Sequence, residues 1–211
     1  MSASTLLPSD RKPPRTGDPA WVVARFYPAQ GDWTEADFAR LPDNRGLELV
    51  DGVIEELPMP SLAHQRILLW VFDLIRQHIH GRIGAEVFFS GYPALIRPRT
   101  LREPDVLLVL DEHAHGKLSN YTRHVDLAVE IVSPDDPDRD YVDKRADYAQ
   151  AGIREYWIVD PKLELLTVLK LEGQAYREAG VFRRGDVFAS LLLPDLHVNV
   201  EQVFAAADGP R

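Results

Sequence analysis

The chain has 211 residues, of which 45% are hydrophobic, enough for one globular domain with a sizeable core. It contains no cysteine, which excludes a disulfide framework, a thiolate metal site and a thiol nucleophile. The formal net charge of −9 argues against a surface built mainly for nucleic acid, because phosphate binding usually requires a basic stripe.

Residues 1–30 are predicted to be an N-terminal tail or arm, and residues 31–211 a single domain. The first 20 residues are polar, with prolines and basic residues and without the apolar core of a signal peptide. The segment "WVVARFYPA" (21–29) is apolar enough for an edge element or for an arm that contacts a partner. No apolar stretch approaches the roughly 20 residues of a membrane span, so we expect a cytoplasmic protein without membrane contact.

The next segments predict a short helix and a β-hairpin. "WTEADFARLP" reads as a helix capped by Thr34, with Asp37 three residues later completing a weak capping box. Alternating strands over 46–50 and 53–57 are joined by Asp51-Gly52, a strong two-residue turn signal.

The middle of the chain predicts one long helix followed by strands. Apolar residues recur at helical spacing over 61–81. Strands are expected in "AEVFFSG" (85–91), "YPALIRP" (92–98) and "EPDVLLVLD" (103–111). A polar loop then leads to "VDLAVEIV" (125–132), which is apolar enough to be a strand buried on both faces.

A second helix and further strands complete the chain. "PDRDYVDKRADYAQAGI" reads as a helix with Pro137 in its first turn and Gly152 at its end. "REYWIVDP" (154–161) is another apolar strand, and the residues after it read as antiparallel strands ending in a short helical turn. The predicted fold class is therefore α/β: a mixed β-sheet flanked by helices, with additional antiparallel strands.

Glu130 stands within the strand "VDLAVEIV", where a buried carboxylate is costly unless it is paired, hydrogen-bonded or bound to a metal. Asp105 opens the strand "PDVLLVL", and adjacent strands would place the two side chains on one face. Two carboxylates and a neighbouring main-chain carbonyl make an oxygen-rich site suited to Mg²⁺. Ordinary interpretations remain open: Asp105 as a turn residue after Pro104, and Glu130 as a buried partner of Arg97 or Arg154.

The strings "PDV", "VEIVSP" and "GIREYWIVDP" resemble the PD-(D/E)xK phosphodiesterase superfamily and, more closely, the Uma family of restriction-endonuclease-like bacterial proteins. The likeness runs from about Trp33 to the end of the chain and includes "ELVDG". It implies a restriction-endonuclease-like fold in which Asp105 and Glu130, with the Ile131 carbonyl, hold Mg²⁺ or Mn²⁺. In the superfamily, a lysine two residues beyond that glutamate orients the attacking water.

Here Val132 stands two residues after Glu130, and it cannot carry a charge. The Uma-type pattern resembles one in which the lysine has moved to the following helix, as Lys144. Asp140, Lys144 and Tyr148 are spaced by four and share one helical face, which could bring the ammonium back towards the carboxylates. The ordinary interpretation of Lys144 is an exposed helix pair with Asp140.

The resemblance also implies roles for Glu48 and His64. Glu48, in "ELVDG", corresponds to a third acid that could bind a second metal or a metal-bound water, and His64 corresponds to a residue near the site. The implied chemistry is phosphodiester hydrolysis, in which the cation lowers the pKa of a bound water. Lys144 would hold the hydroxide and stabilise the developing negative charge. Taken alone, Glu48 reads as an outward-facing strand residue and His64 as a packed or capping histidine.

Arg97, Arg99 and Arg102, just ahead of Asp105, are the candidates for binding DNA, with an ordinary solvated loop as an equal alternative. The string "EHAH" (112–115) suggests zinc, but it lacks a third spaced ligand and favours a solvated loop.

Two classes of function remain. One is a Mg²⁺- or Mn²⁺-dependent endonuclease acting on DNA, and the other is a non-catalytic binding or assembly protein on a nuclease-like scaffold. The acidic composition and the missing E-x-K lysine favour the second, whereas Asp105, Glu130 and Lys144 favour the first, which we predict. Because cutting both strands of a duplex needs two active sites, we also expect a homodimer.

Overall fold

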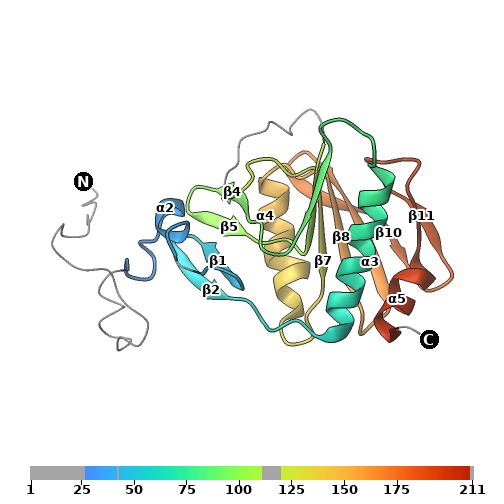
Figure 1. The fold of residues 1–211 in the computed structure, drawn as a ribbon, viewed down its shortest axis with the longest axis horizontal. Helices are drawn as coiled ribbons and strands as arrows, with labels where there is room; N and C mark the ends of the chain where they lie inside the picture. The colour runs from blue at the N-terminus through green and yellow to red at the C-terminus, as the bar shows by residue number, and fades with distance from the viewer. Residues whose placement is uncertain (1–26, 42, 111–119, 210–211) are drawn as a thin grey trace.

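The structure is a computed structural model that describes residues 27–41, 43–110 and 120–209 (Figure 1). The elements in chain order are α2 (Glu35–Phe38), β1 (Leu47–Val50), β2 (Val53–Glu56), α3 (Leu62–His78), β3 (Glu86–Phe89), β4 (Ala94–Arg97), β5 (Thr100–Arg102), β6 (Val106–Val109), β7 (Leu127–Ile131), a π-helical turn (Arg139–Asp143), α4 (Lys144–Gln150), β8 (Glu155–Asp160), β9 (Leu165–Glu172), β10 (Ala175–Phe182), β11 (Val187–Ala189), β12 (His197–Asn199) and α5 (Val200–Asp208).

A six-stranded mixed sheet in the order β10-β9-β8-β7-β6-β3 forms the centre of the fold. The pair β7–β8 is parallel and the other neighbours are antiparallel. Because side chains alternate along a strand, Leu127 and Val129 of β7 pack into the core beneath α3 and α5, whereas Ala128 packs with Tyr148 of α4. The sheet thus lies between α3 and α5 on one face and α4 on the other.

A four-stranded antiparallel sheet in the order β2-β1-β5-β4 lies beside α4 (Figure 1). Trp33, two residues before α2, and Phe38, the last residue of α2, pack against Leu49 of β1 and Leu101 of β5. This second sheet brings the β1 side chains, which are distant from α4 in the sequence, close to the face of α4 that is turned inward.

Most of the expected local structure is confirmed. Thr34 and Asp37 form both hydrogen bonds of the capping box. Asp51 and Gly52 have φ values of 50° and 82°, the left-handed conformation that a tight hairpin turn needs. Ser61 caps α3: its Oγ accepts a hydrogen bond from the His64 N–H. The prediction of a mixed sheet flanked by helices, with additional antiparallel strands, is correct.

Two features differ from the expectation. Residues 100–102, for which no strand is predicted, form β5. The second helix starts with a π-helical turn. The apolar segment 21–26 and the zinc candidate 112–115 lie outside the described residues. Among the helices that the structure describes, none is long and apolar enough to cross a membrane.

Candidate active site

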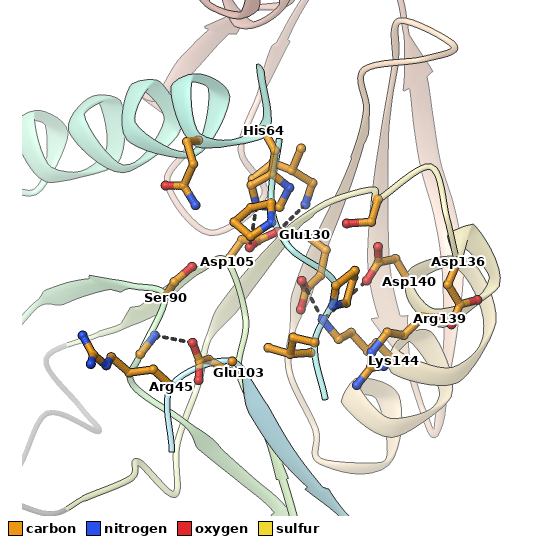
Figure 2. Close-up of a pocket in the computed structure, with 18 residues that line it drawn as sticks. Arg45, His64, Ser90, Glu103, Asp105, Glu130, Asp136, Arg139, Asp140 and Lys144 are labelled. Atoms are coloured by element: carbon orange, nitrogen blue, oxygen red, sulfur yellow. Dashed lines mark hydrogen bonds and ion pairs between the residues drawn. The ribbon is translucent and has the colours of Figure 1, made fainter. Parts of the chain in front are cut away.

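Asp105 and Glu130 meet at the end of two paired strands. β6 and β7 are antiparallel with Val106 opposite Val129, so the next position places Asp105 opposite Glu130. Glu130 is 1% exposed and, like Ala128 two residues earlier, belongs to the α4 face of the sheet. Both acids line one cavity of about 270 Å³, in which Figure 2 shows their side chains with Lys144.

Asp105 is held at both carboxylate oxygens. His64 Nε2 lies 2.9 Å from Oδ1, and the Ile131 main-chain N–H donates to Oδ2 at 2.7 Å. His64 is in the first turn of α3, so the Ser61 cap that starts this helix also places the imidazole. His64 Nδ1 is buried and has no hydrogen-bond partner among the described residues. The orientation of the Asp105 carboxylate is therefore fixed by two independent elements, α3 and β7.

Lys144 reaches Glu130 from α4. Its Nζ lies 2.8 Å from Glu130 Oε2, 3.4 Å from Asp140 Oδ1 and 3.7 Å from Glu48 Oε1. Burial alone would lower the pKa of Lys144, but the surrounding carboxylates outweigh it and raise the pKa, so the ammonium stays charged. The Asp140–Lys144 pair exists, but it is buried instead of lying on an exposed helix face.

Glu130 accepts a hydrogen bond from the Tyr148 hydroxyl in addition to its contact with Lys144. Neither Arg97 nor Arg154 is its partner: Arg97 pairs with carboxylates of the β1–β2 turn and of α4, and Arg154 pairs with Asp126. Burial raises the pKa of Glu130 well above its usual value, Lys144 opposes this, and the nearby carboxylates of Asp105 and Asp140 raise it further. The cavity thus holds more carboxyl groups than Lys144 alone pairs with.

This excess of carboxylate oxygen fits a hard divalent cation. Asp105, Glu130 and Ile131 line the same cavity, and the two carboxylates with the Ile131 carbonyl would offer only oxygen ligands, the type that Mg²⁺ and Mn²⁺ prefer. Within the described ranges, no group of three or more His, Asp or Glu side chains is arranged to hold a metal. A cation would therefore depend on two carboxylates, a main-chain carbonyl and water, and Mg²⁺ usually keeps several waters.

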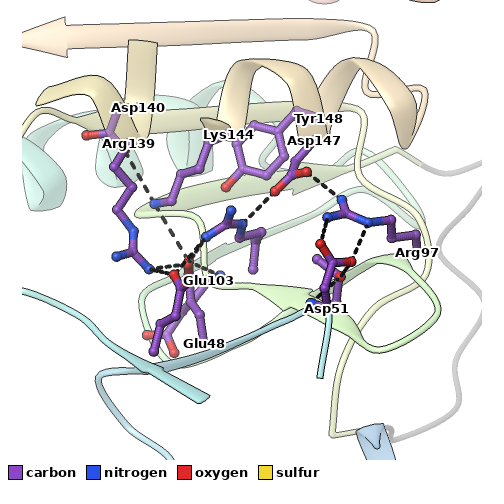
Figure 3. A network of polar contacts seen from close by, with 12 residues as sticks. Glu48, Asp51, Arg97, Glu103, Arg139, Asp140, Lys144, Asp147 and Tyr148 are labelled. Carbon is purple, nitrogen blue, oxygen red and sulfur yellow. Dashed lines mark hydrogen bonds and ion pairs between the residues drawn. The ribbon is translucent and has the colours of Figure 1, made fainter. Parts of the chain in front are cut away.

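Glu48 lies behind this cavity and does not line it. It is completely buried on β1, which excludes the outward-facing alternative. Its Oε2 accepts hydrogen bonds from Arg102 Nη1 and Arg139 Nη2, both at 2.7 Å, and its Oε1 accepts one from the Glu103 N–H at 2.9 Å (Figure 3). The structure brings Glu48 to Lys144 but not to the cavity surface.

The three arginines predicted to bind DNA are not brought to the cavity. Arg102 is 4% exposed and pairs with Glu48 and Asp147, which makes it part of the interior. Arg97 also pairs with Asp147. The Arg99 guanidinium donates to main-chain carbonyls near the hairpin turn. The arginines that do line the cavity are Arg45 and Arg139.

The sequence interpretation missed Glu103, which lines the cavity and is only 8% exposed. The Gly91 N–H donates to its Oε1 at 2.5 Å. Burial raises the pKa of Glu103, as do the nearby charges of Glu48 and Asp105. Its place two residues before Asp105 is a usable signal, because alternate residues of an extended segment lie on the same side. Arg45 and Arg139 carry no comparable local signal.

Two of three comparisons with known proteins find similarity to this chain. Residues 35–201 match the model of the Uma2 family, described as "Putative restriction endonuclease". A solved structure from Anabaena variabilis, described as "a putative nuclease belonging to DUF820", has a TM-score of 0.70 at 20% sequence identity and covers 82% of this chain and 98% of its own. None of the curated proteins compared with the chain matches it. Because the family model spans most of the sequence, the protein belongs to the Uma2 family.

Proposed function

We propose that the protein is a Mg²⁺- or Mn²⁺-dependent endonuclease that hydrolyses phosphodiester bonds in DNA. The observation that carries this proposal is the meeting of Asp105, Glu130 and Lys144 in one cavity, with Lys144 Nζ 2.8 Å from Glu130. The family description supports a nuclease, and the fold shared with the Anabaena variabilis protein is consistent with one.

The side chains of this protein have separate tasks in the proposed reaction. Asp105, Glu130 and the Ile131 carbonyl would hold the cation, which when bound would lower the pKa of water and screen charge on the phosphate. His64 and the Ile131 N–H keep Asp105 in one orientation, which pre-organises the site. The Lys144 ammonium orients the attacking water and stabilises the negative charge that develops on the phosphoryl oxygens.

One observation favours the second candidate, a non-catalytic binding or assembly protein. Lys144, Arg102 and Arg139 already pair with the buried acids Glu48 and Glu130, so this ion network is close to complete without a cation. Buried ion networks can also serve structural purposes only. The net charge of −9 points the same way.

Cleavage of supercoiled plasmid separates the two candidates. The proposed endonuclease converts plasmid to nicked and linear forms with Mg²⁺ or Mn²⁺ and not with EDTA. Asp105→Asn, which keeps the size of the side chain and removes its charge, should abolish this activity. If wild type cleaves no plasmid with any divalent cation, the non-catalytic function replaces the endonuclease, and equal cleavage by wild type and Asp105→Asn would show that Asp105 is not part of the active site.

A further inference from the structure

Glu48 is a buried acid that contacts the candidate site from behind. It is 0% exposed and is absent from the residues that line the cavity, although Lys144 and Glu103, both in contact with it, are among them. A cation in the cavity would meet the carboxylates of Asp105 and Glu130 first. Glu48 therefore has access to the reaction centre only through other residues.

The oxygens of Glu48 are also occupied. Oε2 accepts from two guanidinium groups, Arg102 and Arg139, and Oε1 accepts from the Glu103 N–H and lies 3.7 Å from Lys144 Nζ. An ionised carboxylate offers about four lone-pair positions, and these donors use most of them. Burial would raise the pKa of Glu48, but Lys144, Arg102 and Arg139 outweigh it and lower the pKa to about 2. The carboxylate is therefore ionised and already bound by cationic donors.

These contacts reach both halves of the site. Through Lys144, Glu48 contacts the residue that lies 2.8 Å from Glu130. Through the Glu103 N–H, it holds the main chain two residues before Asp105. Figure 3 shows Glu48 between Lys144, Arg139 and Glu103. One side chain on β1 thus fixes α4 and the segment that enters β6, the two elements that carry Lys144 and Asp105.

We propose that Glu48 is a positioning residue and not a cation ligand: it holds Lys144 by charge and the approach to Asp105 by a hydrogen bond. This inference rests on the proposed endonuclease function. In Glu48→Gln the amide carries no charge, so Lys144 loses one of its acidic neighbours and moves relative to Glu130. The carboxylates of Asp105 and Glu130 stay in place, and the affinity for the cation should hardly change.

The test compares four proteins: wild type, Glu48→Gln, Asp105→Asn and Glu155→Gln. Plasmid cleavage is measured as kcat at saturating Mn²⁺, and the Kd for Mn²⁺ is measured by titration calorimetry without DNA. Glu155 is a matched control, because it is also 0% exposed and accepts hydrogen bonds, from Trp157 and Ser190, outside the cavity. Glu155→Gln therefore removes an equally buried carboxylate that does not line the cavity.

We expect Glu48→Gln to cleave at least tenfold more slowly than wild type, with a Kd for Mn²⁺ within about threefold of the wild-type value. Asp105→Asn should lose Mn²⁺ binding, and Glu155→Gln should cleave at the wild-type rate. A tenfold weaker Kd in Glu48→Gln would make Glu48 a ligand and overturn the inference. A wild-type rate in Glu48→Gln, or an equal loss of rate in Glu155→Gln, would overturn it as well.

Two further outcomes are distinguishable. If wild type binds Mn²⁺ and cleaves no DNA, the proposed function fails, and the positioning role fails with it. If Glu48→Gln does not fold, Glu48→Asp takes its place, because the shorter side chain keeps the negative charge but holds it farther from Lys144. The positioning role then predicts a lower kcat at an unchanged Kd for Mn²⁺, and a weakened Kd would contradict it.

Discussion

Lys144 Nζ lies 2.8 Å from Oε2 of Glu130, and both residues are almost completely buried. The lysine arrives from the helix after the Glu130 strand, and not from the strand itself. The position two residues beyond Glu130 holds Val132, which packs in the hydrophobic cluster beneath α4. Because Val132 carries no charge, the ammonium beside Glu130 is supplied by Lys144 of α4.

Replacing Lys144 by alanine should reduce plasmid cleavage at least 100-fold, because the residue that orients water and stabilises the phosphate charge is removed. It should also lower the free energy of unfolding by about 3 kcal/mol without divalent cations, since Glu130 and Asp140 lose their buried partner. Mn²⁺ should still bind and restore part of the stability. Urea unfolding with and without Mn²⁺, beside the cleavage assay, checks both parts; full activity in the variant would refute the migrated-lysine interpretation.

Mn²⁺ should raise the melting temperature of the wild-type protein, because a ligand that binds only the folded state stabilises it. At about 100 times Kd the gain is about 2.7 kcal/mol. Asp105→Asn should lose this gain, because the carboxylate that His64 and the Ile131 N–H hold in place no longer carries a charge. Differential scanning calorimetry with Mn²⁺ or EDTA measures the shift. An equal shift in both proteins would place the cation elsewhere.

Local structure could be predicted from the sequence, whereas the long-range ion pairs of the arginines could not. The Thr34 cap and the Asp51-Gly52 turn depend on neighbours within a few residues, and both are correct. Arg102 resembled a loop arginine because its partners, Glu48 and Asp147, are far away in the sequence and meet it only after the second sheet packs on α4. The ion pairs of Arg102 with Glu48 and Asp147 therefore cannot be recognised from the residues next to Arg102 in the sequence.

The two predicted acids could be found because a carboxylate within an apolar strand is unusual, and a few neighbouring residues are enough to show it. Glu130 interrupts such a strand, and Asp105 stands in register with it. Lys144 required the family resemblance, since a four-residue spacing with Asp140 also suits a surface pair. Whether the pair is buried depends on which face of α4 meets the sheet, and the structure shows that the Lys144 face does.

The stabilising contribution of Glu48 should depend on pH. Its pKa is lowered to about 2 from the usual 4.5, so its charge stabilises the folded state above pH 4.5, and this contribution is lost as the pH falls towards 2. The difference corresponds to about 3 kcal/mol. Urea unfolding at several pH values should show that wild type exceeds Glu48→Gln most at neutral pH, with the gap closing below pH 4. A gap that stays constant down to pH 3 would mean that the charge of Glu48 does not stabilise the fold.

The protein should be a homodimer in solution, because double-strand cleavage needs two active sites and twofold symmetry is the commonest way to supply them. Light scattering coupled to gel filtration at micromolar concentration should give twice the mass of one chain. A dimer should also convert supercoiled plasmid to the linear form without a long-lived nicked intermediate. A strictly monomeric protein that only nicks would contradict the dimer and leave single-strand cleavage intact.

Arg45 should contribute to DNA affinity, since it lines the cavity and its side chain is 83% exposed. Among the described residues its guanidinium has only a surface ion pair, with Asp43. Arg45→Glu should weaken binding several-fold and reduce the slope of log K against log salt by about 1, because one phosphate contact is lost. Arg177→Glu is the matched control: Arg177 is 61% exposed on β10, has a similar surface partner in Glu172 and lies outside the cavity. Fluorescence anisotropy with a labelled duplex at three salt concentrations gives both quantities.

Arg99→Glu completes the set of variants. If Arg99→Glu loses affinity and Arg45→Glu does not, the arginines predicted from the sequence would be restored as the DNA-binding group.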